Sequence, residues 1–161
     1  MKLSEHLDLS EVTRSETAKR NGIDNNPTPE HLENFKKLAE HVFEPIRNHF
    51  GVPINISSGY RSKALNKSVG GSATSDHCYG RAIDIDMDGS SSGVTNNDIF
   101  HWIKDNLKFK QLIAEFPENG KLGWVHVAYG EGLNTNNVII GIKRGGKTVY
   151  LPYKGNEKLV S

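Results

Sequence analysis

Apolar residues between Thr28 and Phe50 recur at steps of three and four, which is the spacing of a helix with one buried face. Thr28 fits the N-cap of this helix and Pro29 fits its first position. Pro45 is expected to interrupt or kink the helix, because proline lacks a backbone N–H and crowds the preceding turn. The predicted buried face consists of Leu32, Phe35, Leu38, Ala39, Val42, Phe43 and Ile46.

Three other segments carry the signals of helices. Ser10 fits the cap of a short helix that ends near Gly22, where glycine suits a left-handed closing conformation. A second short helix is expected from Ser62, before the loop S-V-G-G-S-A-T-S. A third begins at Thr95, where Asp98 three residues later resembles a capping box.

Alternation with a period of two identifies the strands. In R-A-I-D-I-D-M-D, Ile83 and Ile85 are expected to face the core while Asp84 faces the opposite side. Another strand is expected to start at about Ile54, and two more are expected from Lys110 to Phe116 and from Trp124 to Tyr129. The last two strands, V-I-I-G-I-K and T-V-Y-L-P-Y, are expected to form a hairpin whose turn is R-G-G-K.

These elements predict an α+β fold, with a small antiparallel sheet flanked by helices. The length of 161 residues suits one domain with a substantial core. We expect its helical part at about residues 1–50 and its sheet part at about 51–153. Neither a repeat nor a domain-separating linker is evident in the sequence.

Composition narrows the classes of partner. The 20 Lys and Arg residues balance 19 Asp and Glu residues, so the net charge of +1 does not favour a nucleic acid or an acidic membrane surface. The single cysteine, Cys78, excludes an intrachain disulfide framework. The first residues, M-K-L-S-E-H-L-D-L-S, lack the apolar core of a signal peptide, so synthesis in the cytoplasm and no membrane partner are expected.

Two histidines and an aspartate form a candidate metal site. His77 and Asp84 lie within S-D-H-C-Y-G-R-A-I-D-I-D, and His126 lies in G-W-V-H-V-A-Y. Two imidazoles and one carboxylate leave a fourth tetrahedral position open for water, which distinguishes a catalytic zinc site from a structural one. This set predicts metal-assisted hydrolysis.

The same motifs resemble those of the zinc-dependent D-Ala-D-Ala carboxypeptidase and endolysin family, peptidase M15, particularly its phage-type members. The matching segments are I-S-S-G-Y-R-S, L-N-K-S-V-G-G, S-D-H-C-Y-G-R-A-I-D-I and W-V-H-V-A-Y. The resemblance implies a single domain of the Hedgehog and DD-peptidase kind, with Zn²⁺ bound by His77, Asp84 and His126. Zinc in such a site polarises the scissile carbonyl and lowers the pKa of its water.

The position of the general base departs from the family pattern. Many relatives carry an acidic residue three positions before the last histidine, where this chain has Gly123. F-K-Q-L-I-A-E-F resembles the phage-type branch, which implies that Glu115 takes the role. Glu115 shares a strand face with Gln111 and Ile113, although exposed glutamates without a function are common.

Four further residues are candidates for substrate contact. The resemblance implies that Arg61 lies over the substrate carbonyl or carboxylate, and a planar guanidinium suits such an anion; a surface salt bridge is the alternative. Ser75 is either a support for the loop of the site or an ordinary loop serine. Tyr60 is a candidate for the substrate groove, although core packing is the default for such an aromatic side chain, and Gln111 is a further candidate for substrate binding.

The resemblance implies a monomeric zinc peptidase that cuts amide bonds in the peptide stems of peptidoglycan. The bond is the D-Ala-D-Ala terminus, a cross-bridge or the L-Ala-D-Glu bond, and the residues do not choose among them. The expected setting is a phage lysin, made in the host cytoplasm, that acts at the cell wall after release. Gly123 leaves open a noncatalytic cell-wall-binding or virion structural protein that retains the fold.

Overall fold

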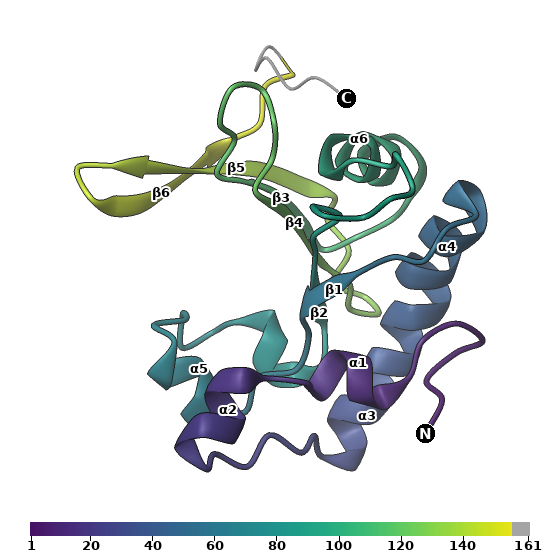
Figure 1. Ribbon diagram of the computed structural model, residues 1–161, viewed down its shortest axis with the longest axis vertical. Helices are drawn as coiled ribbons and strands as arrows, with labels where there is room; N and C mark the ends of the chain where they lie inside the picture. The colour runs from purple at the N-terminus through teal and green to yellow at the C-terminus, as the bar shows by residue number, and fades with distance from the viewer. Residues whose placement is uncertain (156–161) are drawn as a thin grey trace.

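A six-stranded sheet lies at the centre of the computed structural model, which describes residues 1–155 (Figure 1). Its order is β1-β2-β4-β3-β5-β6. The strands are β1 (Ile56–Ser58), β2 (Ala82–Ile85), β3 (Gln111–Glu115), β4 (Trp124–Ala128), β5 (Asn137–Arg144) and β6 (Lys147–Pro152). The sheet and its helices confirm the α+β class.

All neighbouring strands run antiparallel except β3 and β5, which run parallel. The end of β4 lies beside the start of β3, where Ala128 pairs with Gln111. The chain then returns along the start of β3, where Asn136 N–H donates to the carbonyl of Phe109. Because β5 begins at the same end of the sheet as β3, the two strands run in the same direction. This pair is the one departure from the expected antiparallel sheet.

Helices occupy most of the first 50 residues and three later segments. None of those in the described part of the chain has the length and apolar content to cross a membrane. They are α1 (Leu9–Thr13), α2 (Glu16–Asn21), α3 (Pro29–Leu38), the π-helical η1 (Ala39–Phe43), α4 (Glu44–Phe50), α5 (Lys63–Ser68), the 3₁₀ turn η2 (Asp76–Tyr79) and α6 (Asn96–Asn106).

The interruption expected at Pro45 is a π-helical turn. The N–H of Glu44 donates to the carbonyl of Ala39, five residues back, so the helix widens just before the proline. This widening accommodates a residue that cannot donate and whose ring crowds the preceding turn. The helix therefore continues from Pro29 to Phe50 with an altered turn in the middle.

The first predicted helix is two helices, and its predicted cap was wrong. Asp8, rather than Ser10, caps α1, and Glu11 completes a capping box by accepting the N–H of Asp8 at 2.8 Å. Ser15 caps α2 after an extended residue at Arg14. The first strand also begins at Ile56, two residues later than expected.

The predicted starts of the other helices and the final turn are confirmed. Thr28 caps α3, and Ser62 caps α5. Thr95 and Asp98 form the predicted capping box of α6. Gly145 and Gly146 both have positive φ, as a primed hairpin turn requires.

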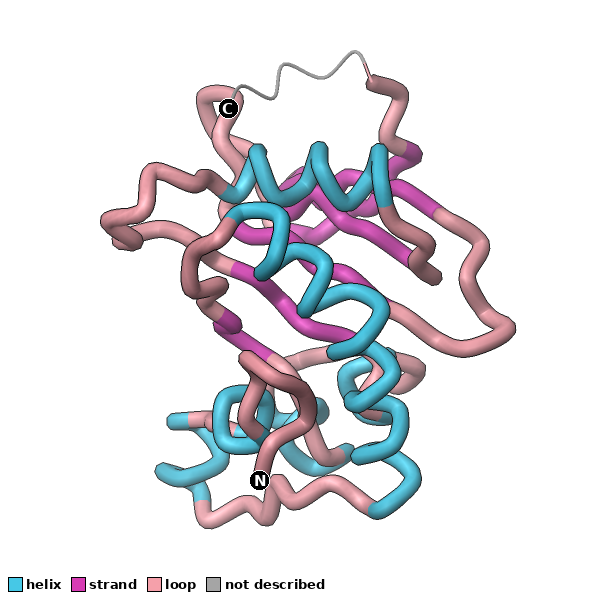
Figure 2. Tube along the Cα trace, turned by 90° about the vertical axis from the view of Figure 1, so that its right-hand side faces the viewer, coloured by secondary structure: helices cyan, strands magenta, loops and turns pink. Residues whose placement is uncertain are grey.

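One face of the sheet is packed and the other is open to a cleft. The long helix and α6 cover the packed face, where they lie in front of the strands in Figure 2. Alternate strand residues such as Ile83, Leu112 and Val127 are fully buried there against Phe35 and Ile103 of the helices. The intervening residues, including Asp84 and His126, therefore point to the opposite face.

Candidate metal centre and cleft

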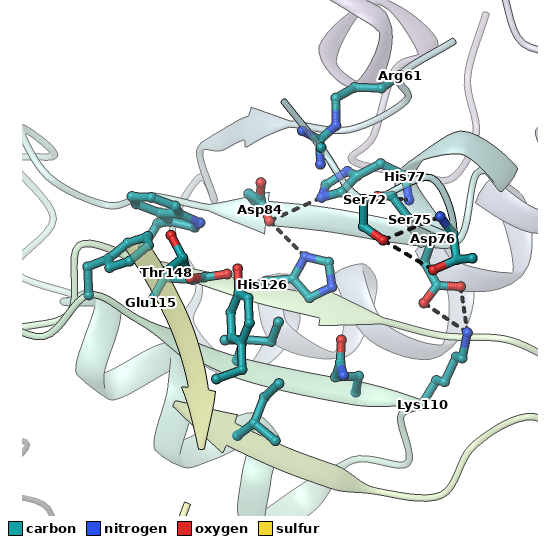
Figure 3. A pocket seen from close by; sticks show the side chains of 18 of the residues that line it. Arg61, Ser72, Ser75, Asp76, His77, Asp84, Lys110, Glu115, His126 and Thr148 are labelled. Carbon is teal, nitrogen blue, oxygen red and sulfur yellow. Dashed lines mark hydrogen bonds and ion pairs between the residues drawn. The ribbon is translucent and has the colours of Figure 1, made fainter. Parts of the chain in front are cut away.

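A cleft of about 890 Å³ lies over the open face of the sheet. Strands β2, β3 and β4 contribute Asp84, Glu115 and His126 to its floor. The loop between α5 and η2 and the β5–β6 hairpin form its sides. Figure 3 shows the polar side chains that point into this cleft.

His77 is fixed by its backbone turn and by a hydrogen bond to its ring. The 3₁₀ turn η2 begins after Ser75, whose hydroxyl accepts the N–H of His77 at 3.3 Å, and ends at Gly80 with φ of 68°. The ring is 1% exposed, and its Nδ1 lies 2.6 Å from the carbonyl oxygen of Gly59. A carbonyl only accepts, so Nδ1 carries a proton and Nε2 is the nitrogen that can bind a metal.

Asp84 and His126 face each other on neighbouring strands. Register pairs them across β2 and β4, and His126 Nδ1 lies 3.0 Å from Asp84 Oδ1. His77 Nε2 reaches the same oxygen at 3.3 Å. Burial opposes ionisation of Asp84, but the two imidazoles outweigh it and hold the pKa of that carboxyl well below its usual range.

These three residues suit a divalent metal ion. Their ligand atoms lie within 4.8 Å of one another. A tetrahedral ion with ligands at about 2.0–2.2 Å would need them about 3.4 Å apart. Asp84 Oδ1 already lies 3.3 and 3.0 Å from the two imidazole nitrogens, so small adjustments suffice. Two imidazole nitrogens and one carboxylate oxygen suit zinc, and they also suit other divalent transition metals.

Glu115 is a buried carboxyl group on an interior strand, rather than a solvated one at an edge. It lies between Trp124 of β4 and Gly141 of β5 and is 5% exposed. Its Oε2 has no hydrogen-bond partner among the described residues. Burial, with a smaller contribution from the charge of Asp84, raises the pKa of Glu115 to about 7, against the opposing effect of His126.

Arg61 enters the cleft above the two histidines. Its backbone N–H donates to the carbonyl of His77 at 3.1 Å, which ties the segment after β1 to η2. Its guanidinium points toward His77 and Asp84 in Figure 3. The buried Nε has no hydrogen-bond partner within residues 1–155, so this side chain keeps a donor for another group.

Besides Arg61, the structure brings two of the other three predicted substrate residues to the cleft. Ser75 and Gln111 line it. Tyr60 lies elsewhere, in the core at 6% exposure, with its ring 6.4 Å from that of Phe35. Its hydroxyl is 3.3 Å from Nδ1 of His31. The position of Tyr60 therefore matches the core alternative.

Several residues that shape the site were not predicted. Lys110 Nζ donates to both carboxylate oxygens of Asp76, at 2.7 and 2.9 Å, and so ties η2 to the start of β3. The carbonyl of Gly59 has no side-chain signal that could have revealed it. Tyr150 and Gly141 lie in the predicted hairpin, where alternation would have placed Tyr150 and Thr148 on one face.

The chain matches the family described as Peptidase M15 over residues 5–127. This segment covers most of the chain and includes all three residues of the candidate metal centre. A comparison with curated proteins gave no significant match. Strands β5 and β6 lie outside the matched segment. The chain therefore belongs to the peptidase M15 family.

Proposed function

We propose that this protein is a zinc-dependent peptidase that hydrolyses an amide bond in the peptide stems of bacterial peptidoglycan. The observation that carries the proposal is that three metal-type ligands converge in one cleft with the buried carboxyl group of Glu115, whose Oε2 has no hydrogen-bond partner among the described residues. Membership of the M15 family supports peptide cleavage. We further propose that it acts as a monomeric phage lysin that reaches the cell wall after release.

His77, Asp84 and His126 would hold the metal. When bound, zinc supplies a Lewis acid that polarises a carbonyl group and acidifies a water molecule. The hydrogen bond from His77 Nδ1 to Gly59 orients the first imidazole. Asp84 is ionised across the neutral pH range, as a ligand must be.

Glu115 and Arg61 would act on the substrate directly. A carboxyl group whose pKa is about 7 can take a proton from the attacking water and return it to the leaving amine near neutrality. Arg61 would donate to the carbonyl oxygen as negative charge develops on it. Ser75 holds the turn that carries His77, and Gln111 offers an amide to the peptide along the floor of the cleft.

The test is mass analysis of muropeptides after incubation of peptidoglycan with the purified protein. The zinc-loaded wild-type protein should generate new amino and carboxyl termini in the muropeptides. A chelator should prevent their formation. Glu115→Gln should lower the rate by about 10²–10⁴-fold, whereas Glu118→Gln, an exposed glutamate on the same segment, should not. The masses also identify the bond that is cut.

A noncatalytic cell-wall-binding or virion component is the competing function, and Gly123 at the usual base position favours it. Its signature would be binding of zinc and of peptidoglycan without any new chain ends in the zinc-loaded samples. That result would overturn the proposed peptidase.

A further inference from the structure

The β5–β6 hairpin forms one side of the cleft, although it lies outside the segment that matches the family. Thr148 and Tyr150 of β6 and Lys143 of β5 line the cleft. The hairpin, yellow in Figure 1, projects beyond the rest of the sheet. Any substrate long enough to pass the candidate metal centre on this side must therefore contact the hairpin.

The base of the hairpin adjoins Glu115. A methyl group placed on Gly141 would lie 2.7 Å from Glu115 Oε2 and 3.0 Å from Tyr150 Cε1, so the tyrosine ring and the carboxyl group flank one glycine. Burial, followed by the charges of Glu115 and Asp84, raises the pKa of Tyr150. The phenol therefore remains neutral and forms an uncharged wall beside the carboxyl group.

The rest of the hairpin is cationic. No Asp or Glu occurs between residues 132 and 155, whereas Lys143, Arg144 and Lys147 lie together at the hairpin turn. None of these three forms an ion pair with a carboxylate within the described part of the chain. Their charges are therefore available to an anionic group of a ligand.

Of these three cations, Lys143 is the one that lines the cleft. Its Nζ lies 5.1 Å from the centre of the Phe116 ring and donates to Thr148 Oγ1 at 3.0 Å. Phe116 directly follows Glu115. Lys143 is two strand residues from Gly141, a separation of about 7 Å. That distance equals about two residues of an extended peptide.

We propose that the hairpin is a substrate-binding arm in which Lys143, with Arg144 and Lys147 behind it, binds a carboxylate of the stem peptide about two residues from the bond that is cut. This inference rests on the proposed function, because it requires a peptide in the cleft. Stem peptides carry free carboxylates along their length, and an ammonium group without an ion pair complements them. The arm would give the enzyme a preference for acidic over amidated stems.

The test uses two synthetic stem peptides that differ only in a free or an amidated carboxyl group two residues from the cleaved bond. The KM of the wild type should be on the order of fivefold lower for the acidic peptide, as expected for one exposed ion pair. Lys143→Met keeps the alkyl chain over Phe116 and should bring the ratio of the two KM values close to one. Lys19→Met, at an exposed position on α2, is the matched control and should keep the wild-type ratio.

A second measurement does not need turnover. Sedimentation with insoluble peptidoglycan at low salt should show less bound protein for Lys143→Met than for wild type or Lys19→Met. An unchanged KM ratio in Lys143→Met, or equal sedimentation of all three proteins, overturns the arm while leaving the peptidase proposal intact. Binding that depends on Lys143 without cleavage of any stem peptide overturns the peptidase, and the hairpin is then a peptidoglycan-binding surface rather than a substrate arm.

Discussion

At the scale of single residues, the surroundings of Glu115 decide what its carboxyl group can do. The side chain is enclosed by two neighbouring strands, and one of its oxygens has no partner among the described residues. Water that would solvate the charged form is excluded, so the neutral form is favoured up to about pH 7. The burial that raises the pKa of Glu115 therefore also lowers the free energy of unfolding when the carboxyl group ionises.

Substitution of Glu115 by glutamine should make the metal-free protein more stable at pH 8 but not at pH 4. The folded state binds this proton more tightly than the unfolded state between about pH 4.5 and 7, so its contribution to stability falls as the pH rises through that window. Glu115→Gln should gain on the order of 3 kcal/mol relative to wild type at pH 8. Urea unfolding at both pH values measures this gain, and equal differences at the two pH values would contradict it.

Gly141 should be sensitive to the smallest substitution. The added methyl group of Gly141→Ala would press on Glu115 Oε2 and on the Tyr150 ring, so the carboxyl group must move. Because the closest atom ends a side chain that can shift, the loss of stability should lie near the lower limit for overpacking, about 1 kcal/mol. The misplaced base should lower the rate at least about tenfold. Zinc affinity should be unchanged, because the three candidate ligands are untouched. Loss of zinc binding in this variant would indicate general misfolding.

At the scale of elements, two substitutions test whether Asp8 or Ser10 is the N-cap of α1. Asp8→Ala should lower the free energy of unfolding by about 1 kcal/mol, because it removes the acceptor for the N–H of Ser10. Ser10→Ala should change it by less than about 0.5 kcal/mol. Chemical denaturation of the two variants decides between them, and a larger effect at Ser10 would restore the original prediction.

Element boundaries were predictable where a local hydrogen bond determines them. The capping box of Thr95 and Asp98 and the turn formed by the glycine pair of the last hairpin depend only on neighbouring residues. Both predictions were correct. The prediction of the first cap was wrong because aspartate and serine are equally good N-cap residues. Asp8 is the cap because Glu11, three residues later, completes a capping box with it. The parallel pairing of β3 with β5 depends on where the chain returns after β4, and no local pattern encodes that path.

The candidate site was predictable only in part for a related reason. Strand alternation places Asp84 and His126 on one face, and the motifs add His77, so their convergence follows from the sequence. Tyr60 follows β1 in a turn, where alternation does not determine the direction of a side chain, and it lies in the core. The enclosure of Glu115 comes from Gly141 and Tyr150, which are distant in sequence and meet it only through the parallel pair.

At the scale of the whole molecule, the candidate metal centre brings together side chains from three separate segments of the chain. His77 lies on η2, which the Asp76–Lys110 ion pair attaches to β3, while Asp84 and His126 lie on β2 and β4. A ligand that binds only the folded state stabilises it by mass action. Zinc should therefore stabilise the entire domain rather than one loop.

Zinc at about one hundred times its dissociation constant should add about 2.7 kcal/mol to stability, which for a chain of this size raises Tm by roughly 5–10 °C. Differential scanning calorimetry with zinc and with chelator measures this shift. Asp84→Asn should abolish it, because an amide cannot supply the anionic ligand between the two imidazoles, whereas Asp88→Asn at an exposed position should keep it. A shift that persists in Asp84→Asn would place the zinc elsewhere and remove the basis of the proposed peptidase.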